Sequence, residues 1–300
     1  MKVIIPGGSG LIGSSLARLL ISKGYVPVIV SRSKVNINSN IETAEWNPYS
    51  EELDTKPFED TDAVINLSGY PIAAGRWTKK RRKLIYDSRI ITTKKLVSIF
   101  EQLDKKPQIF IAGSAVGYYG DRGDEVLDEK SSPGNDFAAR VCNDLEQEAV
   151  KAEKLGIRTV RIRTGVVLSK SGGALAKMLL PFKMGLGGRL GSGSQYFPWI
   201  HETDLVKIFL YCLENTKIGG AVNGVSPGIV TNKEFTRELG KALKRPAVFP
   251  VPAAGLKLIL GEMSSVLLGS QRAEAKKIIE AGFKFEFENI EDALLDCLRK

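Results

Sequence analysis

The chain has 300 residues, of which 43% are hydrophobic and 26% charged, with a formal net charge of +9. No apolar run approaches the ~20 residues that cross a bilayer, and no secretory leader precedes the first apolar residues, so we expect a cytoplasmic protein without a membrane partner. Its single histidine, His201, and three widely spaced cysteines leave no pattern for a metal site or a histidine-based triad.

The positive charge is not concentrated as a nucleic-acid binder requires. Its densest run, residues 79–83, opens a predicted helix, and a solvated helix face is the ordinary interpretation of such a run. A small anionic ligand needs only a few of these charges. We therefore expect no nucleic-acid partner.

The first half of the chain alternates predicted strands and helices. Apolar runs predict strands at residues 3–5, 27–30, 63–67, 109–112 and 159–162. Helical spacing predicts helices over residues 11–23, 78–103 and 135–155. Solidly apolar strands separated by helices indicate a parallel sheet covered on both faces. The predicted fold is therefore α/β, a Rossmann-type doubly wound sheet.

The pattern changes after Gly165. Five glycines within residues 183–195 suggest a mobile loop, and residues 197–200 return to strand character. Thr231 with Glu234 has the form of a capping box and predicts a helix start, and Phe283, Phe285 and Phe287 suggest a short strand. We interpret residues 1–170 as the Rossmann core, to which residues 196–226 return, and residues 227–300 as a smaller C-terminal α/β substrate lobe.

A glycine-rich turn joins the first strand to the first helix. Gly7 permits a tight turn, Gly10 lets the backbone approach a pyrophosphate, and Gly13 lets the helix lie close on the sheet. Free N–H groups at the helix N-terminus would hold the phosphates. The turn predicts a dinucleotide site in contact with Gly7, Ser9, Gly10, Leu11, Ile12 and Gly13.

The end of the second strand indicates which dinucleotide is bound. NAD sites place an Asp or Glu there for the ribose hydroxyls. This strand ends in Ser31-Arg32 without a carboxylate, and Arg32 can pair with a 2′-phosphate. The alternative is an ordinary surface arginine. We therefore predict NADP(H), with NAD(H) less favoured.

Motifs along nearly the whole chain resemble the extended short-chain dehydrogenase/reductase superfamily, the nucleotide-sugar epimerase and dehydratase group. The narrower resemblance is to an atypical branch called epimerase family proteins, sometimes cell-division inhibitor-like. The motifs are GGSGLIG at 7–13, NLSG at 66–69, SRIITTKKL at 88–96, SAVGYYG at 114–120, DFAARVCNDLE at 136–146, RTGVVLS at 163–169, PWIHETDLV at 198–206 and a C-terminal block over 245–283. The resemblance implies a Rossmann core with a C-terminal substrate lobe, and no known reaction.

The resemblance also implies further site residues. Ser114 ends the strand that carries the superfamily's catalytic Ser or Thr, and it is also an expected cofactor contact. Arg89 would face the sheet, where it could contact the cofactor or anchor an anionic substrate; the alternative is an ion pair with Asp87 or another carboxylate. The remaining implied contacts are Leu67, Ser68 and Gly69 along the cofactor ribose, and Thr164, Gly165 and Val166 beside the nicotinamide.

One part of the superfamily pattern is missing. Its general acid/base is a Tyr followed four residues later by a Lys, so that both lie on one helix face and the Lys lowers the pKa of the Tyr. No tyrosine of this chain has a Lys at that spacing, and the corresponding helix reads FAARVC over residues 137–142. The usual proton-transfer mechanism is therefore excluded.

Other side chains could handle the proton. Ser114 could hydrogen-bond a substrate carbonyl. Tyr118 or Tyr119, in the loop after the same strand, could donate a proton or pack on the small lobe. We expect His201 to be structural, and Cys142 to be an inert core thiol because no base is nearby. The candidate catalytic residues are Ser114, Tyr118 and Tyr119.

Three functions follow, in order of preference. The first is an NADP(H)-dependent oxidoreductase acting on a small carbonyl or hydroxyl compound, anionic in the preferred version. The second is a non-catalytic protein that binds or senses NADPH, and the third is a nucleotide-sugar epimerase with substituted catalytic residues. A homodimer through the helices at 78–103 and 135–155 would need acids such as Glu146 to compensate the basic start of the first helix.

Overall fold

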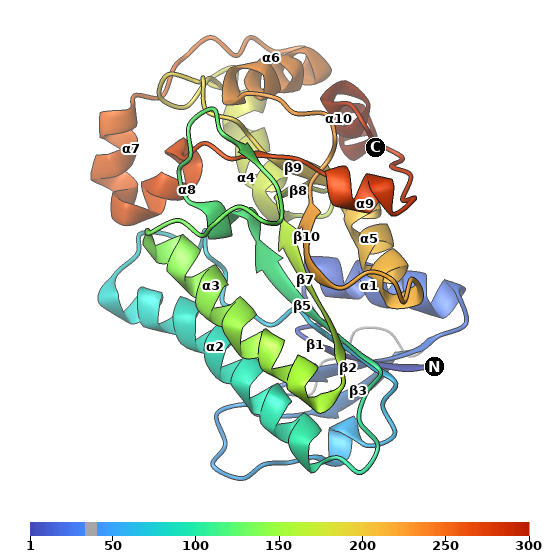
Figure 1. Cartoon of the computed structure of the whole chain (residues 1–300). Coiled ribbons are helices and arrows are strands. Elements are labelled where there is room, and N and C mark those ends of the chain that lie inside the picture. Colours follow the sequence, from blue (N-terminus) through green and yellow to red (C-terminus); the bar gives the residue numbers. More distant parts are fainter. Residues whose placement is uncertain (34–40, 300) are drawn as a thin grey trace.

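Seven parallel strands form the centre of the fold, in the order β10-β7-β5-β4-β1-β2-β3. The computed structural model describes residues 1–33 and 41–299 (Figure 1). The strands are β1 (Lys2–Pro6), β2 (Val26–Ser31), β3 (Glu42–Glu45), β4 (Ala63–Asn66), β5 (Ile109–Ala115), β7 (Arg158–Thr164) and β10 (Gly220–Gly224). The strand order reverses between β1 and β4, where doubly wound sheets bind their ligands. The predicted Rossmann-type α/β fold is confirmed.

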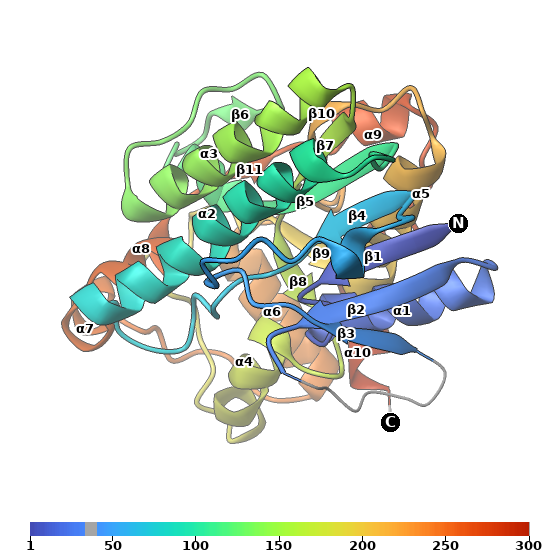
Figure 2. The same cartoon turned by 90° about the horizontal axis from the view of Figure 1, so that it is seen from below.

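Helices cover both faces of this sheet. Figure 1 shows α2 (Lys79–Gln102) and α3 (Phe137–Val150) side by side on one face, with α1 (Leu11–Ser22) and α5 (Glu202–Glu214) on the other, and Figure 2 shows the same layers from below. Alternation along β1 explains why both faces are apolar: Val3 and Ile5 pack with the α1 side, and Ile4 with the α2 and α3 side.

The chain leaves the sheet after β7 and returns to it at β10. Between them, β8 (Val166–Leu168) pairs with β9 (Trp199–His201) in a separate two-stranded sheet. The strand predicted near residues 197–200 is therefore confirmed, although it lies outside the main sheet. The glycine-rich loop has no helix or strand over residues 184–198, and backbone hydrogen bonds tie it to the chain at Phe249 and Val251.

Much of the C-terminal part of the chain lies beyond the end of the central sheet (Figure 1). It also contacts helices on both faces, since Tyr211 of α5 donates to the Ala281 carbonyl and Arg82 of α2 pairs with Glu262. The capping box that starts α6 is present as predicted, with Thr231 and Glu234 bonding to each other's backbone N–H groups. The remaining elements are α4 (Gly173–Lys183), α6 (Asn232–Leu243), α7 (Ala253–Leu260), α8 (Ser264–Leu268), α9 (Lys276–Glu280), α10 (Ile290–Leu298), the short strands β6 (Val126–Leu127) and β11 (Arg272–Ala273), and the 3-10 turns η1 (Lys56–Phe58), η2 (Val116–Tyr119), η3 (Lys151–Leu155) and η4 (Gly261–Met263).

The strand predicted at Phe283, Phe285 and Phe287 is wrong. The carboxylate of Asp204 accepts hydrogen bonds from the backbone N–H groups of Glu286 and Phe287, at 2.8 and 3.0 Å. These donors are therefore not available to a neighbouring strand. The alternating aromatic residues pack in an irregular segment instead, with the rings of Phe283 and Phe285 edge to face.

Candidate cofactor and substrate site

The turn after β1 has the geometry of a phosphate-binding turn. A Cβ on Gly7 would lie 2.6 Å from the backbone of Leu67, and one on Gly13 would lie 2.4 Å from the Cα of Gly8, so both positions require glycine. At Gly10, which precedes α1, the nearest atom to such a Cβ is 3.4 Å away, and no side chain caps the helix. The first N–H groups of α1 are thus open to an anion.

Two adjoining cavities form one cleft over the carboxyl ends of β1, β2, β4 and β5. The outer cavity, about 480 Å³, lies beside the end of β2, and the inner cavity, about 270 Å³, lies against α3. The two share the lining residues Gly7, Gly10, Leu67 and Ser68. A continuous cleft at the point where the strand order reverses fits an extended dinucleotide.

The outer cavity holds the side chains predicted to select the cofactor. Ser31 and Arg32 line it beside Tyr49, and no carboxylate is among its lining residues in the part of the chain that the structure describes. Arg32 is exposed, so its guanidinium is free to approach a phosphate. The other predicted cofactor residues in this cavity are Gly7, Ser9, Gly10, Leu67, Ser68 and Gly69.

The inner cavity contains a second group of the predicted residues. These are Leu11, Ile12, Gly13, Arg89, Ser114 and Thr164. Gly165 and Val166 line neither cavity, since they pack against Pro198, whose carbonyl accepts the Val166 N–H at 2.7 Å. The prediction that these two residues flank a nicotinamide therefore has no direct support from the cleft.

The wall formed by α3 lacks both groups of the usual acid/base pair. Ala138 and Cys142, one helical turn apart, both face the inner cavity. Burial raises the pKa of the Cys142 thiol to about 11, against the opposing effect of Arg89. The thiol therefore stays protonated at neutral pH, in agreement with an inert core cysteine.

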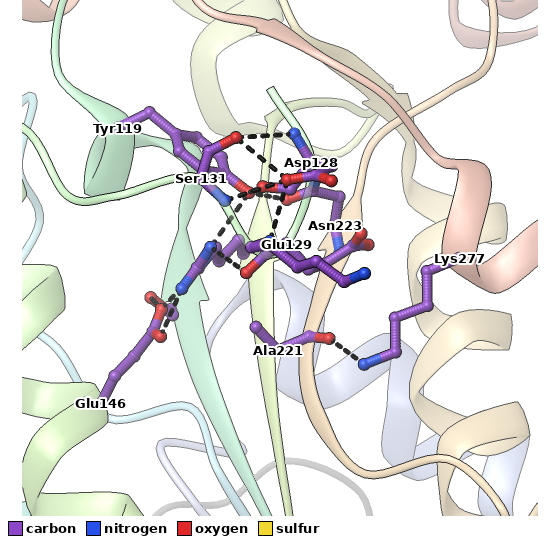
Figure 3. Close-up of polar contacts among 11 residues, drawn as sticks. Tyr119, Asp128, Glu129, Ser131, Glu146, Ala221, Asn223 and Lys277 are labelled. Carbon is purple, nitrogen blue, oxygen red and sulfur yellow. Dashed lines mark hydrogen bonds and ion pairs between the residues drawn. The ribbon is translucent and has the colours of Figure 1, made fainter. Parts of the chain in front are cut away.

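Ser114 is the one candidate catalytic residue that lines the inner cavity. Its hydroxyl donates to Glu146 Oε1 at 2.7 Å. Glu146 in turn accepts from the Nε and Nη2 atoms of Arg163, at 3.0 and 2.9 Å, with both side chains at most 5% exposed (Figure 3). No motif in the sequence marks Glu146 as a site residue, although it lies one turn beyond Cys142 on the same helix face. Because Glu146 is buried in this pair, it is not a surface acid for a dimer interface.

Tyr119 belongs to the core, contrary to its candidacy as a proton donor. Its side chain is fully buried, and its hydroxyl accepts from Arg163 at 3.1 Å and donates toward Asn223 Oδ1 at 2.6 Å (Figure 3). Burial raises the pKa of Tyr119 to about 12. Tyr118 does not line the cavity either, because its ring stacks on the Arg163 guanidinium at 3.5 Å.

Arg89 reaches the inner cavity from α2. Its Nη1 donates to the carbonyl oxygens of Tyr70 and Ile85, each at 3.1 Å. The alternative pairing with Asp87 is not present among the described residues, and the Asp87 carboxylate pairs with Lys83 instead, at 2.5 Å. Burial lowers the pKa of the Arg89 guanidinium, and no carboxylate pairs with it among residues 1–33 and 41–299.

His201 lies outside the cleft and has a structural role. Its Nδ1 accepts the backbone N–H of Thr203 at 3.2 Å and so caps α5, and its Nε2 is 3.4 Å from Asp296. Across the described residues, we find no cluster of three potential metal ligands and no helix long and apolar enough to cross a membrane.

Comparison with known proteins supports the cleft assignment. Residues 3–223 match the NAD dependent epimerase/dehydratase family, and residues 251–297 match a domain of unknown function, DUF1731. The chain belongs to the NAD-dependent epimerase/dehydratase family. An epimerase family protein of Mycobacterium bovis is 40% identical over 293 residues, covering 97% of this chain and 96% of that protein.

Two further relatives extend this comparison. A chloroplastic epimerase family protein of Arabidopsis thaliana is 38% identical and covers 98% of this chain and 86% of its own length. The crystal structure of human epimerase family protein SDR39U1 with NADPH superposes with a TM-score of 0.89 at 32% identity, covering 99% of each chain. The human protein thus carries the cofactor that the sequence predicts for this cleft.

Proposed function

We propose that this protein is an NADP(H)-dependent oxidoreductase that interconverts a hydroxyl and a carbonyl group on a small molecule. The observation that carries the proposal is the Ser114 hydroxyl, which lines the inner cavity while bonded to the ionisable Glu146. The NADPH of the human relative and the Ser31-Arg32 end of β2 support the choice of cofactor.

Different residues of the cleft would bind different parts of the cofactor. The open N–H groups at Leu11 and Ile12 would hold the pyrophosphate, and Arg32 with Ser31 would bind the 2′-phosphate. The nicotinamide end then lies in the inner cavity, where it would supply or accept a hydride. The apolar α3 wall excludes water from this end, which strengthens polar contacts made inside it.

Ser114 and Glu146 replace the missing Tyr and Lys in moving the proton. Because the Ser114 hydroxyl donates to Glu146, its lone pairs remain for a substrate hydroxyl. In the oxidative direction the substrate O–H proton passes to Ser114 Oγ as the Ser114 proton passes to the Glu146 carboxylate. Carbonyl reduction is the reverse. Ser114 is the catalytic residue here, and Glu146 accepts the proton through it.

Arg163 keeps the Glu146 carboxylate in place beneath Ser114. Burial alone would lower the pKa of Arg163, but Glu146 and Tyr119 raise it above the ordinary arginine value. The guanidinium is thus a fixed positive charge, with two of its nitrogens on Glu146.

A carbonyl screen with Ser114→Ala tests this function. General acid/base catalysis contributes about a hundredfold or more, so the variant should oxidise NADPH at least about a hundredfold more slowly with any carbonyl that the wild type reduces. Its NADPH affinity should not change. Ser22→Ala, an exposed position on α1, is the matched control. Full activity in Ser114→Ala would remove Ser114 from the mechanism.

A second candidate function is non-catalytic binding or sensing of NADPH. Ala138 and Cys142 favour it, because neither side chain replaces the missing acid/base pair. Tight NADPH binding without reduction of any carbonyl in the screen would support this function. Stabilisation by UDP- or dTDP-sugars would instead favour nucleotide-sugar chemistry. The cytoplasmic location and the homodimer remain proposals, and one relative is named as chloroplastic.

A further inference from the structure

The inner cavity contains one charged side chain in an otherwise apolar wall. Of its lining residues, only Arg89 is charged, and only Ser68, Ser114 and Thr164 are polar. The apolar lining is Leu11, Ile12, Leu67, Ile72, Trp77, Ile85, Ala115, Phe137, Ala138, Val141, Cys142, Leu145, Leu205 and Phe209. A ligand that fits this wall has an apolar body and few polar groups.

Arg89 is held in place by the protein without being neutralised by it. One nitrogen, Nη1, donates both hydrogen bonds that Arg89 makes to described residues, to the carbonyl oxygens of Tyr70 and Ile85. The guanidinium lies against Gly69, where a Cβ would come within 2.8 Å of Cζ and Nη2. Glycine at position 69 therefore makes room for the guanidinium beside the cavity.

An enclosed cation without an acidic partner is costly, and a bound anion removes that cost. No acidic residue lines the inner cavity within the described chain, so the anion must come from a ligand. The dinucleotide phosphates have their own partners at the start of α1 and at Arg32. Nη1 is engaged with two carbonyl oxygens, whereas no described residue accepts a hydrogen bond from Nε or Nη2. A planar guanidinium that offers these two nitrogens suits a carboxylate, which it binds through two parallel hydrogen bonds.

The position of Ser114 relates this anion site to the reacting atoms. Arg89 and Ser114 line this one small cavity together with Cys142, and both act on the pKa of the Cys142 thiol, so both lie near it. A ligand with its carboxylate on Arg89 therefore has carbon atoms close to its acid group within reach of Ser114. The cavity, about 270 Å³, is slightly smaller than the roughly 300–1,000 Å³ usual for ligand sites, which limits the size of the apolar body.

We propose that the inner cavity takes a small hydroxy acid or oxo acid with an apolar side chain, binding its carboxylate on Arg89 and its hydroxyl or carbonyl oxygen on Ser114. The inference rests on the proposed function, because it names the substrate class of that same site. The reaction it implies is oxo acid plus NADPH plus a proton giving hydroxy acid plus NADP⁺.

Binding to the oxidised-cofactor complex tests the inference apart from turnover. Phenylpyruvate and its methyl ester differ in charge and little in shape, and neither can be reduced when the protein is saturated with NADP⁺. Calorimetry should show the acid binding at least about tenfold more tightly than the ester, since a charge-assisted pair contributes that much. Arg89→Met should remove this preference and leave NADP⁺ affinity within about twofold of the wild type.

Two further variants complete the test. Lys94→Met removes an exposed cation from the same helix and should leave the preference unchanged. Arg89→Lys keeps the positive charge but lacks the planar guanidinium, so it should retain part of the preference for the acid over the ester. This variant replaces Arg89→Met in the test if Arg89→Met fails to fold. Equal binding of acid and ester by the wild type would overturn the inference.

A loss of NADP⁺ affinity in Arg89→Met as large as the loss of acid affinity would also overturn it, since Arg89 would then belong to the cofactor. The proposed function fails in a different way. If the acid binds through Arg89 but no carbonyl compound oxidises NADPH, the ligand class stands and the redox function does not.

Discussion

The outer and inner ends of the cleft are formed by different groups: mainly backbone at the outer end and mainly side chains at the inner end. The outer end is made largely of backbone, with glycines required at positions 7 and 13 and uncapped N–H groups at the start of α1. The inner end depends on individual side chains, and there Ala138 and Cys142 face the cavity from α3, one helical turn apart. Few substitutions are possible in a phosphate-binding turn made of backbone. An acid/base pair made of two side chains can be removed by two substitutions that leave the fold intact.

The two ends also differ in the setting of their arginines. Arg32 at the outer end is exposed and needs no partner in the free protein. Arg89 at the inner end is enclosed, with burial lowering its pKa, and lacks an acidic neighbour among the described residues. The first arginine is suited to choosing between two cofactors, and the second to binding one anion in an apolar surrounding.

The largest predicted effect is the loss of stability on breaking the ion pair beneath the inner end. Glu146→Gln leaves Arg163 buried without a countercharge, which should cost about 3–5 kcal/mol of unfolding free energy. Glu148→Gln breaks only a surface pair with Lys151 and should cost about 1 kcal/mol or less. Urea unfolding measures both. If the two variants are equally stable, the Glu146–Arg163 pair does not stabilise the fold beneath Ser114.

A methyl group at Gly10 should separate binding from folding at the outer end. Nothing in the protein lies closer than 3.4 Å to the added atom, so Gly10→Ala should fold normally. The methyl group occupies the approach of the pyrophosphate, and we expect at least about tenfold weaker NADPH binding, or 1.4 kcal/mol. Gly219→Ala, also in open space, is the control for both readouts. Unchanged NADPH affinity would place the phosphates elsewhere.

Replacing Arg32 tests cofactor choice at the same end. Arg32→Gln removes the charge that we propose binds the 2′-phosphate, so NADPH affinity should fall about tenfold while NADH affinity stays constant. Fluorescence titration of both nucleotides gives the two values. If both affinities fall together, Arg32 contacts a part common to the two cofactors.

The smallest effect concerns His201, which supports neither end of the cleft. Burial lowers its pKa below 6.5, against the opposing influence of Asp296, Asp204, Glu202 and Glu286. The unfolded chain therefore takes up a proton at a higher pH than the folded protein, and stability should fall as the pH drops below about 6.5 toward the folded pKa.

His201→Asn removes this titration and keeps a residue that caps helices well. Its unfolding free energy should change less than that of the wild type between about pH 7.5 and about pH 5.5, as measured by urea unfolding. Identical pH dependence of the two proteins would show that another group titrates.

The sequence was sufficient where the signal is local. The turn at Gly7, Gly10 and Gly13 and the alternation of apolar strands with helices depend on neighbouring residues, and both are confirmed. Contacts between distant residues were not predicted. Ser114 and Glu146 are 32 positions apart, and Glu146 and Arg163 are 17 apart, so nothing local marks them as partners.

Two of the differences between expectation and structure have the same origin. Phe285 and its neighbours alternate like a strand, but Asp204, 82 positions before Glu286, takes the backbone donors. Tyr119 follows the strand that ends in Ser114, yet the hydrogen bond to Asn223, 104 positions away, fixes it in the core. In both cases a buried polar group was satisfied by a distant partner, which overrides the local pattern.

Transfer of deuterium from labelled NADPH tests the central claim most directly. NADPH carrying deuterium at the reactive C4 position is incubated with phenylpyruvate and the wild-type protein or Ser114→Ala, and the hydroxy acid is examined by mass spectrometry. The wild type should place one deuterium on the reduced carbon, and Ser114→Ala should do so at least about a hundredfold more slowly. Bound NADPH with no deuterium in the product, for this acid and for every carbonyl of the screen, would contradict the account and leave a protein that only binds its cofactor.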